Sequence, residues 1–326
     1  MMRLRVVGTG LALPSDRRTT HELARLAVPH RDAAEIEAIT GIRGRHWLGS
    51  EDAASTLASL ALRQALAAAR LEPPALRRLI FASSTGGDWL IPATANCILD
   101  DLGLDDHCDA FDLNNSCAGF LSAFDVAARS IATGLGPVAV VVSETFSRYI
   151  APASPRPYLV LGDAAAAVVL QPSGAGGVLA SAMKNSGELR GLLSAPHPGR
   201  TGKREPLQFK PSHEEMTASA LRLVRARTTE ALQAASLGLR DIDWFLPHQP
   251  NGSMFERFAE EMGFGLERCA RVVHELGSVG AASIPASLHR LLESGVVSNG
   301  DRILLVGVGG GTASGAIIYQ HGAAGE

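Results

Sequence analysis

Asp112-Leu-Asn-Asn-Ser-Cys-Ala-Gly-Phe-Leu-Ser-Ala-Phe124 joins an apolar run to a strongly periodic segment and places Cys117 at the junction. The periodicity of residues 118–133 predicts a helix, so the thiol is expected at a helix N-terminus. Unpaired N–H groups and the helix dipole favour a thiolate there, and we expect the pKa of Cys117 to lie below its free value of about 8.5. This stretch alone leaves two interpretations open, a reactive nucleophile and a small buried side chain.

The same pattern occurs a second time further along the chain. Ser278-Val-Gly-Ala-Ala-Ser-Ile-Pro285 leads through a predicted helix to an apolar strand at residues 303–306, as the Cys117 stretch leads to an apolar strand at residues 138–142. A small residue followed by glycine closes both helices. We infer two copies of one α/β unit, in which Ser278 is the counterpart of Cys117.

Short β-branched runs alternate with longer Ala/Leu-rich helical patterns over the whole chain, which predicts an α/β fold with buried strands. Together with the repeat, the alternation divides the chain into an N-terminal half, residues 1–172, and a C-terminal half, residues 173–326. Residues 190–212, rich in Gly, Pro, Lys and Arg, are expected to be irregular. The predicted strands are 79–82, 138–142, 165–170, 244–246, 303–306 and 316–319, and the predicted helices are 53–69, 118–133, 214–235, 254–262 and 281–293.

Composition excludes several classes of function. The 326 residues are 46% hydrophobic with a net charge of −3, so neither nucleic acid nor an anionic membrane surface is an expected partner. The four cysteines lack the spacing of a metal site or a disulfide framework, which favours a reducing cytoplasm. We expect no signal peptide, and no run approaches the roughly 20 apolar residues of a membrane helix.

Two further motifs carry chemistry. In Trp244-Phe-Leu-Pro-His-Gln-Pro-Asn251, His248 ends a predicted strand, where α/β proteins handle ligands, and is suited to acid–base work; a buried structural histidine is the alternative. In Val306-Gly-Val-Gly-Gly-Gly-Thr312, glycines allow backbone amides to approach an anion or oxyanion. A dinucleotide fingerprint fails because Ser314 stands where the third glycine belongs. No phosphate-loop or His-Glu-x-x-His pattern occurs, so no cofactor and no metal are expected.

Several of these segments occur in the order found in one family. The chain resembles ketoacyl-acyl-carrier-protein synthase III, of the thiolase-like condensing-enzyme superfamily, at the Cys117 stretch, 247–251, 277–285, 309–311, Thr40-Gly-Ile-Arg43 and Leu161-Gly-Asp163. The resemblance implies a thiolase-like duplicated five-layer α-β-α-β-α fold. It also implies a homodimer that takes acyl groups from acyl-coenzyme A or acyl-carrier protein.

The resemblance further implies a mechanism. Cys117 attacks an acyl thioester to form an acyl-enzyme, and the amides of Cys117 and Gly310 form the oxyanion hole. His248 then acts on the second substrate. At the family's active-site asparagine this chain has Ser278, whose hydroxyl donates one hydrogen bond where an amide donates two. Decarboxylative condensation with a malonyl thioester is the first expectation, and non-decarboxylating acyl transfer to an alcohol, an amine or an activated carbon in secondary metabolism is the alternative.

Other departures concern substrate binding. The family's residues that grip coenzyme A correspond here to Glu35 and Ile39, which leaves Arg148 and Asn251 as the expected contacts to the donor. Ile91 replaces a common phenylalanine at the acyl-pocket gate and is expected to admit longer or branched chains, although ordinary packing also explains it. A non-catalytic partner subunit is a third hypothesis, and the presence of both Cys117 and His248 argues against it.

Overall fold

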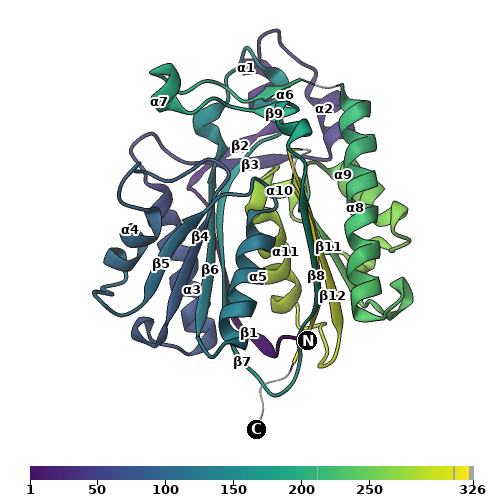
Figure 1. The fold of residues 1–326 in the computed structure, drawn as a ribbon. Helices are drawn as coiled ribbons and strands as arrows, with labels where there is room; N and C mark the ends of the chain where they lie inside the picture. The colour runs from purple at the N-terminus through teal and green to yellow at the C-terminus, as the bar shows by residue number, and fades with distance from the viewer. Residues whose placement is uncertain (211, 311–312, 323–326) are drawn as a thin grey trace.

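Two mixed β-sheets, covered by helices on both faces, form the framework of this computed structural model, which describes residues 1–210, 212–310 and 313–322 (Figure 1). The first sheet has the order β1-β7-β6-β4-β5 and the second the order β11-β12-β13-β8. The strands of the first are β1 (Leu4–Ala12), β4 (Arg78–Ala82), β5 (Asp109–Leu113), β6 (Val138–Thr145) and β7 (Asp163–Pro172). Those of the second are β8 (Gly177–Asn185), β11 (Trp244–Pro247), β12 (Arg302–Gly309) and β13 (Ala313–Gln320).

The two sheets repeat one pattern of strand directions. In the first, β4 runs parallel to β6, while β6–β7 and β7–β1 are antiparallel. In the second, β11 runs parallel to β12, while β12–β13 and β13–β8 are antiparallel. The duplication inferred from the sequence is therefore present in the topology. The expected boundary between residues 172 and 173 falls between β7 and β8, and its role as a domain boundary stays a prediction.

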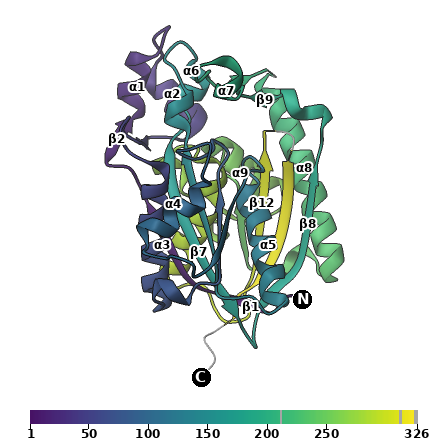
Figure 2. The same ribbon diagram turned by 60° about the vertical axis from the view of Figure 1, so that its left-hand side comes forward.

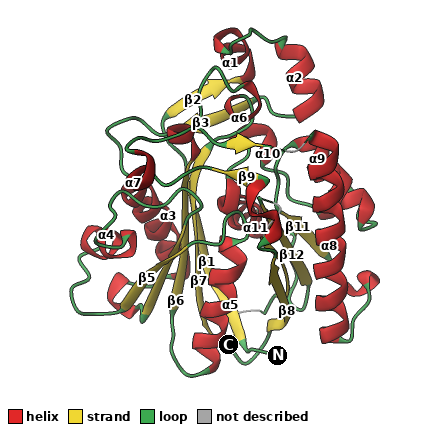
Figure 3. Cartoon of the chain, turned by 45° about the horizontal axis from the view of Figure 1, so that its top comes forward, coloured by secondary structure: helices red, strands yellow, loops and turns green. Residues whose placement is uncertain are grey.

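Helices and sheets alternate as five layers, which Figures 1 and 3 show from two directions. Helices α3 and α4 cover the outer face of the first sheet, α5 and α11 lie between the sheets, and α8 and α9 cover the outer face of the second. Their bounds are α3 (Ala54–Ala69), α4 (Thr94–Asp101), α5 (Gly119–Ala132), α8 (His213–Ala235), α9 (Gly252–Glu261) and α11 (Ser283–Glu293).

The central layer is built from the repeated unit. Helix α5 packs Phe120 and Phe124 into the largest apolar cluster, and α11 adds Ile284 and Leu288 from the other half. All eight residues of β6 are buried, as is usual for a strand covered by helices on both faces. Because α5 and α11 share this core, the segments that begin them, at Cys117 and Ser278, are brought into one region of the molecule.

Shorter elements gather at one end of the sheets, as Figure 2 shows for α1, α2, α6 and α7. They are α1 (Thr20–Leu26), α2 (Ala33–Thr40), α6 (Pro155–Tyr158), α7 (Pro198–Thr201) and α10 (Val273–Leu276), with β2 (Asp16–Thr19) paired to β3 (Gly44–Trp47) and β9 (Leu193–Ser194) paired to β10 (Gln208–Phe209). The segment 190–212, expected to be irregular, thus contains α7 and a two-residue strand pair, both too short to leave a periodic signal. Among the described residues, no helix is long and apolar enough to cross a bilayer.

Candidate active site

Cys117 lies at the start of α5, as the sequence predicts, and is nearly buried at 8% exposure. The chain turns sharply just before it, because Ser116 adopts a left-handed conformation with φ of +52°. The end of β12 presses against this turn: a Cβ atom at Gly309 would stand 2.7 Å from the Cys117 amide nitrogen. Only glycine permits that approach, so the C-terminal half supports the nucleophile of the N-terminal half.

The environment of the thiol corrects one expectation. Burial and, to a smaller extent, the Glu144 carboxylate together raise the pKa of Cys117 to about 12. The Ser116 side chain and the amides of Cys117 and Gly310 act in the opposite direction, but they do not offset the loss of water. The prediction of a lowered pKa from the helix N-terminus alone was therefore wrong. The convergence of the Cys117 and Gly310 amides on the sulfur is nevertheless the arrangement that an oxyanion hole requires.

His248 follows β11 directly and is almost fully buried. Its amide donates to the Val306 carbonyl oxygen at 2.7 Å, which fixes the backbone, and its Nδ1 lies 2.8 Å from Ser283 Oγ, which fixes the ring. Burial lowers the pKa of His248 to about 4, while a hydrogen bond with the Gly280 backbone opposes that shift. The imidazole is therefore neutral at pH 7 and able to accept a proton.

Ser278 lies in the segment between α10 and α11, at 5% exposure. Its amide donates to the Val160 carbonyl oxygen at 2.8 Å, and its own carbonyl oxygen accepts from the Gly162 amide at 3.1 Å. These two bonds fasten the segment to the Leu161-Gly162-Asp163 motif of the N-terminal half.

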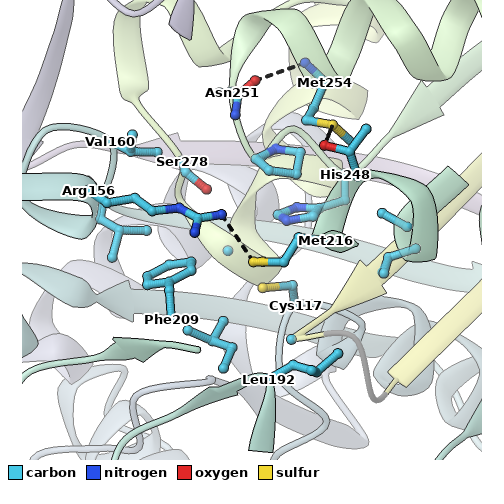
Figure 4. A pocket seen from close by; sticks show the side chains of 18 of the residues that line it. Cys117, Arg156, Val160, Leu192, Phe209, Met216, His248, Asn251, Met254 and Ser278 are labelled. Carbon is cyan, nitrogen blue, oxygen red and sulfur yellow. Dashed lines mark hydrogen bonds between the residues drawn. The ribbon is translucent and has the colours of Figure 1, made fainter. Parts of the chain in front are cut away.

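A cavity of about 140 Å³ brings the three predicted residues together (Figure 4). Cys117, His248 and Ser278 all line it, and Asn251 reaches it from the N-terminus of α9, where Asn251 Oδ1 accepts from the Met254 amide at 2.8 Å. Apolar side chains make up most of the remaining wall. Cys117 also borders a second, more polar cavity of about 650 Å³, so the sulfur stands at a junction between two spaces.

Other predicted residues lie elsewhere. Ile91 is 82% exposed and is not among the residues that line either cavity. Arg148 lines neither cavity, but it pairs at 3.4 Å with Asp88, which lines the larger one, and also donates to the Asp52 carbonyl oxygen. The roles expected for Ile91 and Arg148 stay predictions. Gly311, part of the predicted glycine turn, lies outside the described residues.

Sequence reasoning missed two charged residues. Arg156, on α6, lines the smaller cavity with its guanidinium 4.9 Å from the Phe209 ring and 3.1 Å from the Met216 sulfur. Nothing in its proline-bounded segment indicates this position. Glu144, near the end of β6, is buried close to Cys117. A carboxylate directly after the apolar run 138–142 was the signal that could have identified Glu144, because strand ends in α/β sheets face the ligand.

Among the residues that the structure describes, no group of three His, Cys, Asp or Glu side chains could hold a metal ion. The groups that meet at the site are a thiol, an imidazole, a hydroxyl and backbone amides around an apolar cavity. This donor set, on a duplicated five-layer fold, defines the class of thiolase-like condensing enzymes, which form acyl-enzymes.

Comparisons with known proteins agree with this class. The family model described as 3-oxoacyl-[acyl-carrier-protein (ACP)] synthase III matches residues 111–187, and the model of its C-terminal part matches residues 232–321. A beta-ketoacyl-[acyl-carrier-protein] synthase III from Neisseria gonorrhoeae is 32% identical over 325 residues, covering 98% of this chain and 100% of the relative. The chain therefore belongs to the 3-oxoacyl-[acyl-carrier-protein] synthase III family.

Solved structures show the same relationship. The 3-oxoacyl-[acyl-carrier-protein] synthase III from Aquifex aeolicus superposes with a TM-score of 0.90 at 29% identity, covering 98% of this chain and 100% of that one. The priming β-ketosynthase of the R1128 polyketide pathway gives 0.90 at 25% identity, covering 98% and 97%. The thiolase-like fold and an acyltransferase of the condensing type are thereby confirmed. Neither acyl transfer to a heteroatom nor a non-catalytic role is favoured over condensation.

Proposed function

We propose that this protein forms an acyl thioester on Cys117 and condenses the acyl group with the carbon nucleophile released from a malonyl thioester. The observation that carries the proposal is the meeting of Cys117, His248 and Ser278 on one cavity, with the amides of Cys117 and Gly310 turned to the sulfur. In the first step the sulfur attacks the acyl carbonyl carbon, the amides hold the oxyanion, and the donor thiolate leaves. In the second step the carbanion attacks the acyl-Cys117 carbonyl carbon and Cys117 departs.

The resting protonation states determine how the first step proceeds. With the pKa of Cys117 raised to about 12 and that of His248 lowered to about 4, thiol and imidazole are both neutral at pH 7. The proton therefore leaves Cys117 during the attack rather than before it, and the neutral His248 ring is the acceptor that we assign. After acylation the same ring is available to polarise the malonyl thioester carbonyl.

We further propose that Ser278 occupies the place of the family's active-site asparagine. Its position on the cavity wall beside His248 supports this assignment. A hydroxyl is shorter than an amide and donates a single hydrogen bond, so it stabilises the malonyl-derived enolate less. Decarboxylation is then expected to be slower than with asparagine in this place, and condensation to be limited by that step.

Two measurements test the function. Intact mass spectrometry after incubation with a panel of acyl thioesters is expected to show one acyl group per chain, located on Cys117 by peptide mapping. Release of labelled carbon dioxide from malonyl thioester is expected in the wild type and about tenfold faster in Ser278→Asn. If the wild type captures the acyl group but releases no carbon dioxide, decarboxylative condensation is excluded and acyl transfer to another acceptor is the function that agrees with the result.

The donor and the assembly follow from the same proposal. We assign acyl-coenzyme A or acyl-carrier protein as the donor and the cytoplasm as the location, and rates of Cys117 acylation by matched pairs of the two donors decide between the carriers.

We also propose a homodimer, because Trp89, Leu90 and Ile91 are 66%, 82% and 82% exposed beside the larger cavity, which is costly for a monomer in water. Sedimentation is expected to show a dimer that Leu90→Glu dissociates, and a monomeric wild type would contradict it.

A further inference from the structure

Glu144 is a buried carboxyl group for which the condensation mechanism has no use. It lies near the end of β6 with 0% exposure, and no ion pair with it is found among the residues that the structure describes. An uncompensated buried carboxylate is costly, and proteins keep one where its hydrogen bonds or its charge act on something else. The surroundings of Glu144 identify what it acts on.

The carboxyl group receives hydrogen bonds from both halves of the molecule. From the loop after β4, Ser84 donates through its amide at 3.0 Å and its hydroxyl at 2.6 Å, and the Ser83 hydroxyl lies at 3.4 Å. From the segment after Ser278, the Ala281 amide donates to Oε1 at 3.0 Å. Glu144 is thus a bridge between the strand ends of the first sheet and the segment of the second half that carries Ser278.

The bridge reaches His248 through one residue. A Cβ atom at Gly280 would lie 2.9 Å from Glu144 Oε1 and 2.6 Å from the Phe146 ring, so the Gly280 backbone, at φ of +51°, is pressed against the carboxyl group. The same backbone is hydrogen bonded to the His248 ring. Gly280 also lines the cavity that Cys117 lines, and the Glu144 carboxylate contributes to raising the pKa of that thiol.

We propose that Glu144 is a positioning residue that fixes the segment carrying Ser278 and Gly280 against the first sheet and, through its charge, sets how readily Cys117 becomes a thiolate. The proposal rests on Cys117 being the acylated residue. A negative Glu144 holds the resting thiol protonated and so protects it from adventitious electrophiles. Acylation removes the thiol, and the repulsion with it, so the charge acts on the free enzyme and not on the acyl-enzyme.

One other buried carboxyl group near Glu144 also titrates within the working pH range, because burial raises the pKa of Asp163 to about 6, so a variant of each carboxyl group is needed. On β7, Asp163 is the neighbour of Ala164, which is the strand partner of Glu144. The Asp163 carboxylate accepts hydrogen bonds from the Leu48 and Ser147 amides. Arg148, after β6, pairs with Asp88. From the loop after β4, Ser83 and Ser84 meet Glu144 with uncharged groups, and the Asp88 of that loop is the partner of Arg148; the remaining groups are His248, neutral at pH 7, and Cys117 itself. Burial raises the pKa of Glu144 to about 7 against its hydrogen-bond donors, so its charge changes within the working pH range.

The test measures alkylation of substrate-free Cys117 by iodoacetamide between pH 5.5 and 9. Each unit of thiol pKa changes the thiolate fraction about tenfold when the pH lies far below the pKa. In the wild type we expect the logarithm of the rate to rise with pH, flatten around pH 7 as Glu144 ionises, and rise again. In E144Q we expect one straight line that meets the wild type near pH 6 and lies about tenfold above it at pH 8.5.

Controls separate charge from disturbance of the fold. E144D keeps a carboxylate and is expected to retain the flattened region, whereas D163N removes a buried carboxyl group on the adjacent strand and is expected to leave the wild-type profile unchanged. An E144Q rate at pH 8.5 equal to or below that of the folded wild type would overturn the proposal. So would a straight wild-type profile.

Two further measurements complete the test. If E144Q does not fold, Ser84→Ala removes the 2.6 Å donor while keeping the charge, and the flattened region is expected to move to higher pH; an unmoved region overturns the proposal. For the positioning role, acyl transfer from preloaded Cys117 is expected to fall about tenfold in E144Q, with loading not reduced, and unchanged transfer overturns it. The alkylation needs no acyl substrate, so a failure of the condensation assignment leaves this result interpretable.

Discussion

The two halves of the molecule share a topology but support each other by opposite means. At the end of β6, the N-terminal half presents the Glu144 carboxyl group, which holds the Ala281 amide next to the C-terminal half's Ser278 segment. At the end of β12, the C-terminal half presents Gly309, whose bare backbone presses on the Cys117 amide of the N-terminal half. Corresponding strands thus brace the opposite helix start, one through a charged acceptor and one through the absence of a side chain.

This crossed arrangement explains why duplication produced one site instead of two. Each helix start depends on a strand end from the other half, so neither half holds a complete site alone. The positions have also diverged: the N-terminal half supplies the thiol and the Cys117 amide, and the C-terminal half supplies an imidazole, a hydroxyl and the Gly310 amide. Variants that remove or weaken these groups test how much each half contributes to acylation and to condensation.

The largest expected effect comes from comparing the loss of the Cys117 thiol with the loss of the Ser278 hydroxyl. Cys117→Ala removes the nucleophile, and we expect acyl capture to disappear and condensation to fall by at least about 10³-fold. Ser278→Ala is expected to keep acyl capture and to lose part of the condensation rate. Quench-flow measurement of acyl-enzyme and product resolves the two steps, and Cys97→Ala on α4 is the control for loss of a thiol. Acyl capture surviving in Cys117→Ala would assign the nucleophile elsewhere.

A smaller effect is expected from the brace on the nucleophile. Gly309→Ala places a methyl group 2.7 Å from a backbone nitrogen and 3.0 Å from Ser116 Cβ, so either β12 or the turn has to move. We expect condensation to fall about 10²-fold, as for loss of one oxyanion donor, and unfolding free energy to fall by about 1–3 kcal/mol.

The matched control for this substitution is Gly174→Ala, whose added methyl group meets nothing within 4 Å. Denaturant unfolding of both variants measures the change in unfolding free energy, and steady-state kinetics measure the change in the condensation rate. A Gly309→Ala enzyme with a wild-type condensation rate would show that β12 does not position Cys117. Only the contact from β6 to the Ser278 segment would then support a helix start of the other half.

The repeat made the fold predictable from the sequence, whereas the contacts between the two halves could not be predicted from it. Periodicity and the matched spacing of Cys117 and Ser278 indicated two α/β units, and the six predicted strands are present with extended ends. Those extensions matter, because β6 continues past its apolar run to Glu144. β-Strands such as β5, with charged residues and a partly exposed face, escaped prediction because their signal is short and mixed.

The sequence indicated some of the residues that meet on the cavity, but neither its other wall residues nor its electrostatics. Strand ends and a helix start indicated His248 and Cys117, since these positions follow from local pattern. The pKa of Cys117 depends instead on burial by β12 and on Glu144, which lie 27 or more positions away in sequence and meet it only in the fold. Arg156 was missed for the same reason, because its place on the cavity wall comes from packing against Phe209 and Met216.

A moderate effect is expected where the C-terminal half orients its own base. Ser283→Ala removes the hydroxyl 2.8 Å from His248 Nδ1, and a net hydrogen bond of about 1 kcal/mol corresponds to a roughly fivefold fall in kcat. Ser287→Ala, one turn further along α11, removes a hydroxyl that bonds Gln249 instead and serves as the control. Comparable losses of kcat in both variants would indicate general disturbance of α11 rather than orientation of the ring.

The smallest expected effect concerns the N-terminal half's share of the cavity wall facing Ser278. Arg156→Met keeps apolar contact with Phe209 but removes the only Lys, Arg, Asp or Glu side chain among the described residues that line the smaller cavity. Since a guanidinium attracts the polar arm of a thioester donor without touching the reacting carbon, we expect KM to rise about threefold with kcat nearly unchanged. Arg240→Met, on an exposed surface, is the control. A fall in kcat at constant KM would place Arg156 in the chemical step, and the N-terminal half would then contribute a cation to the reaction as well as the thiol.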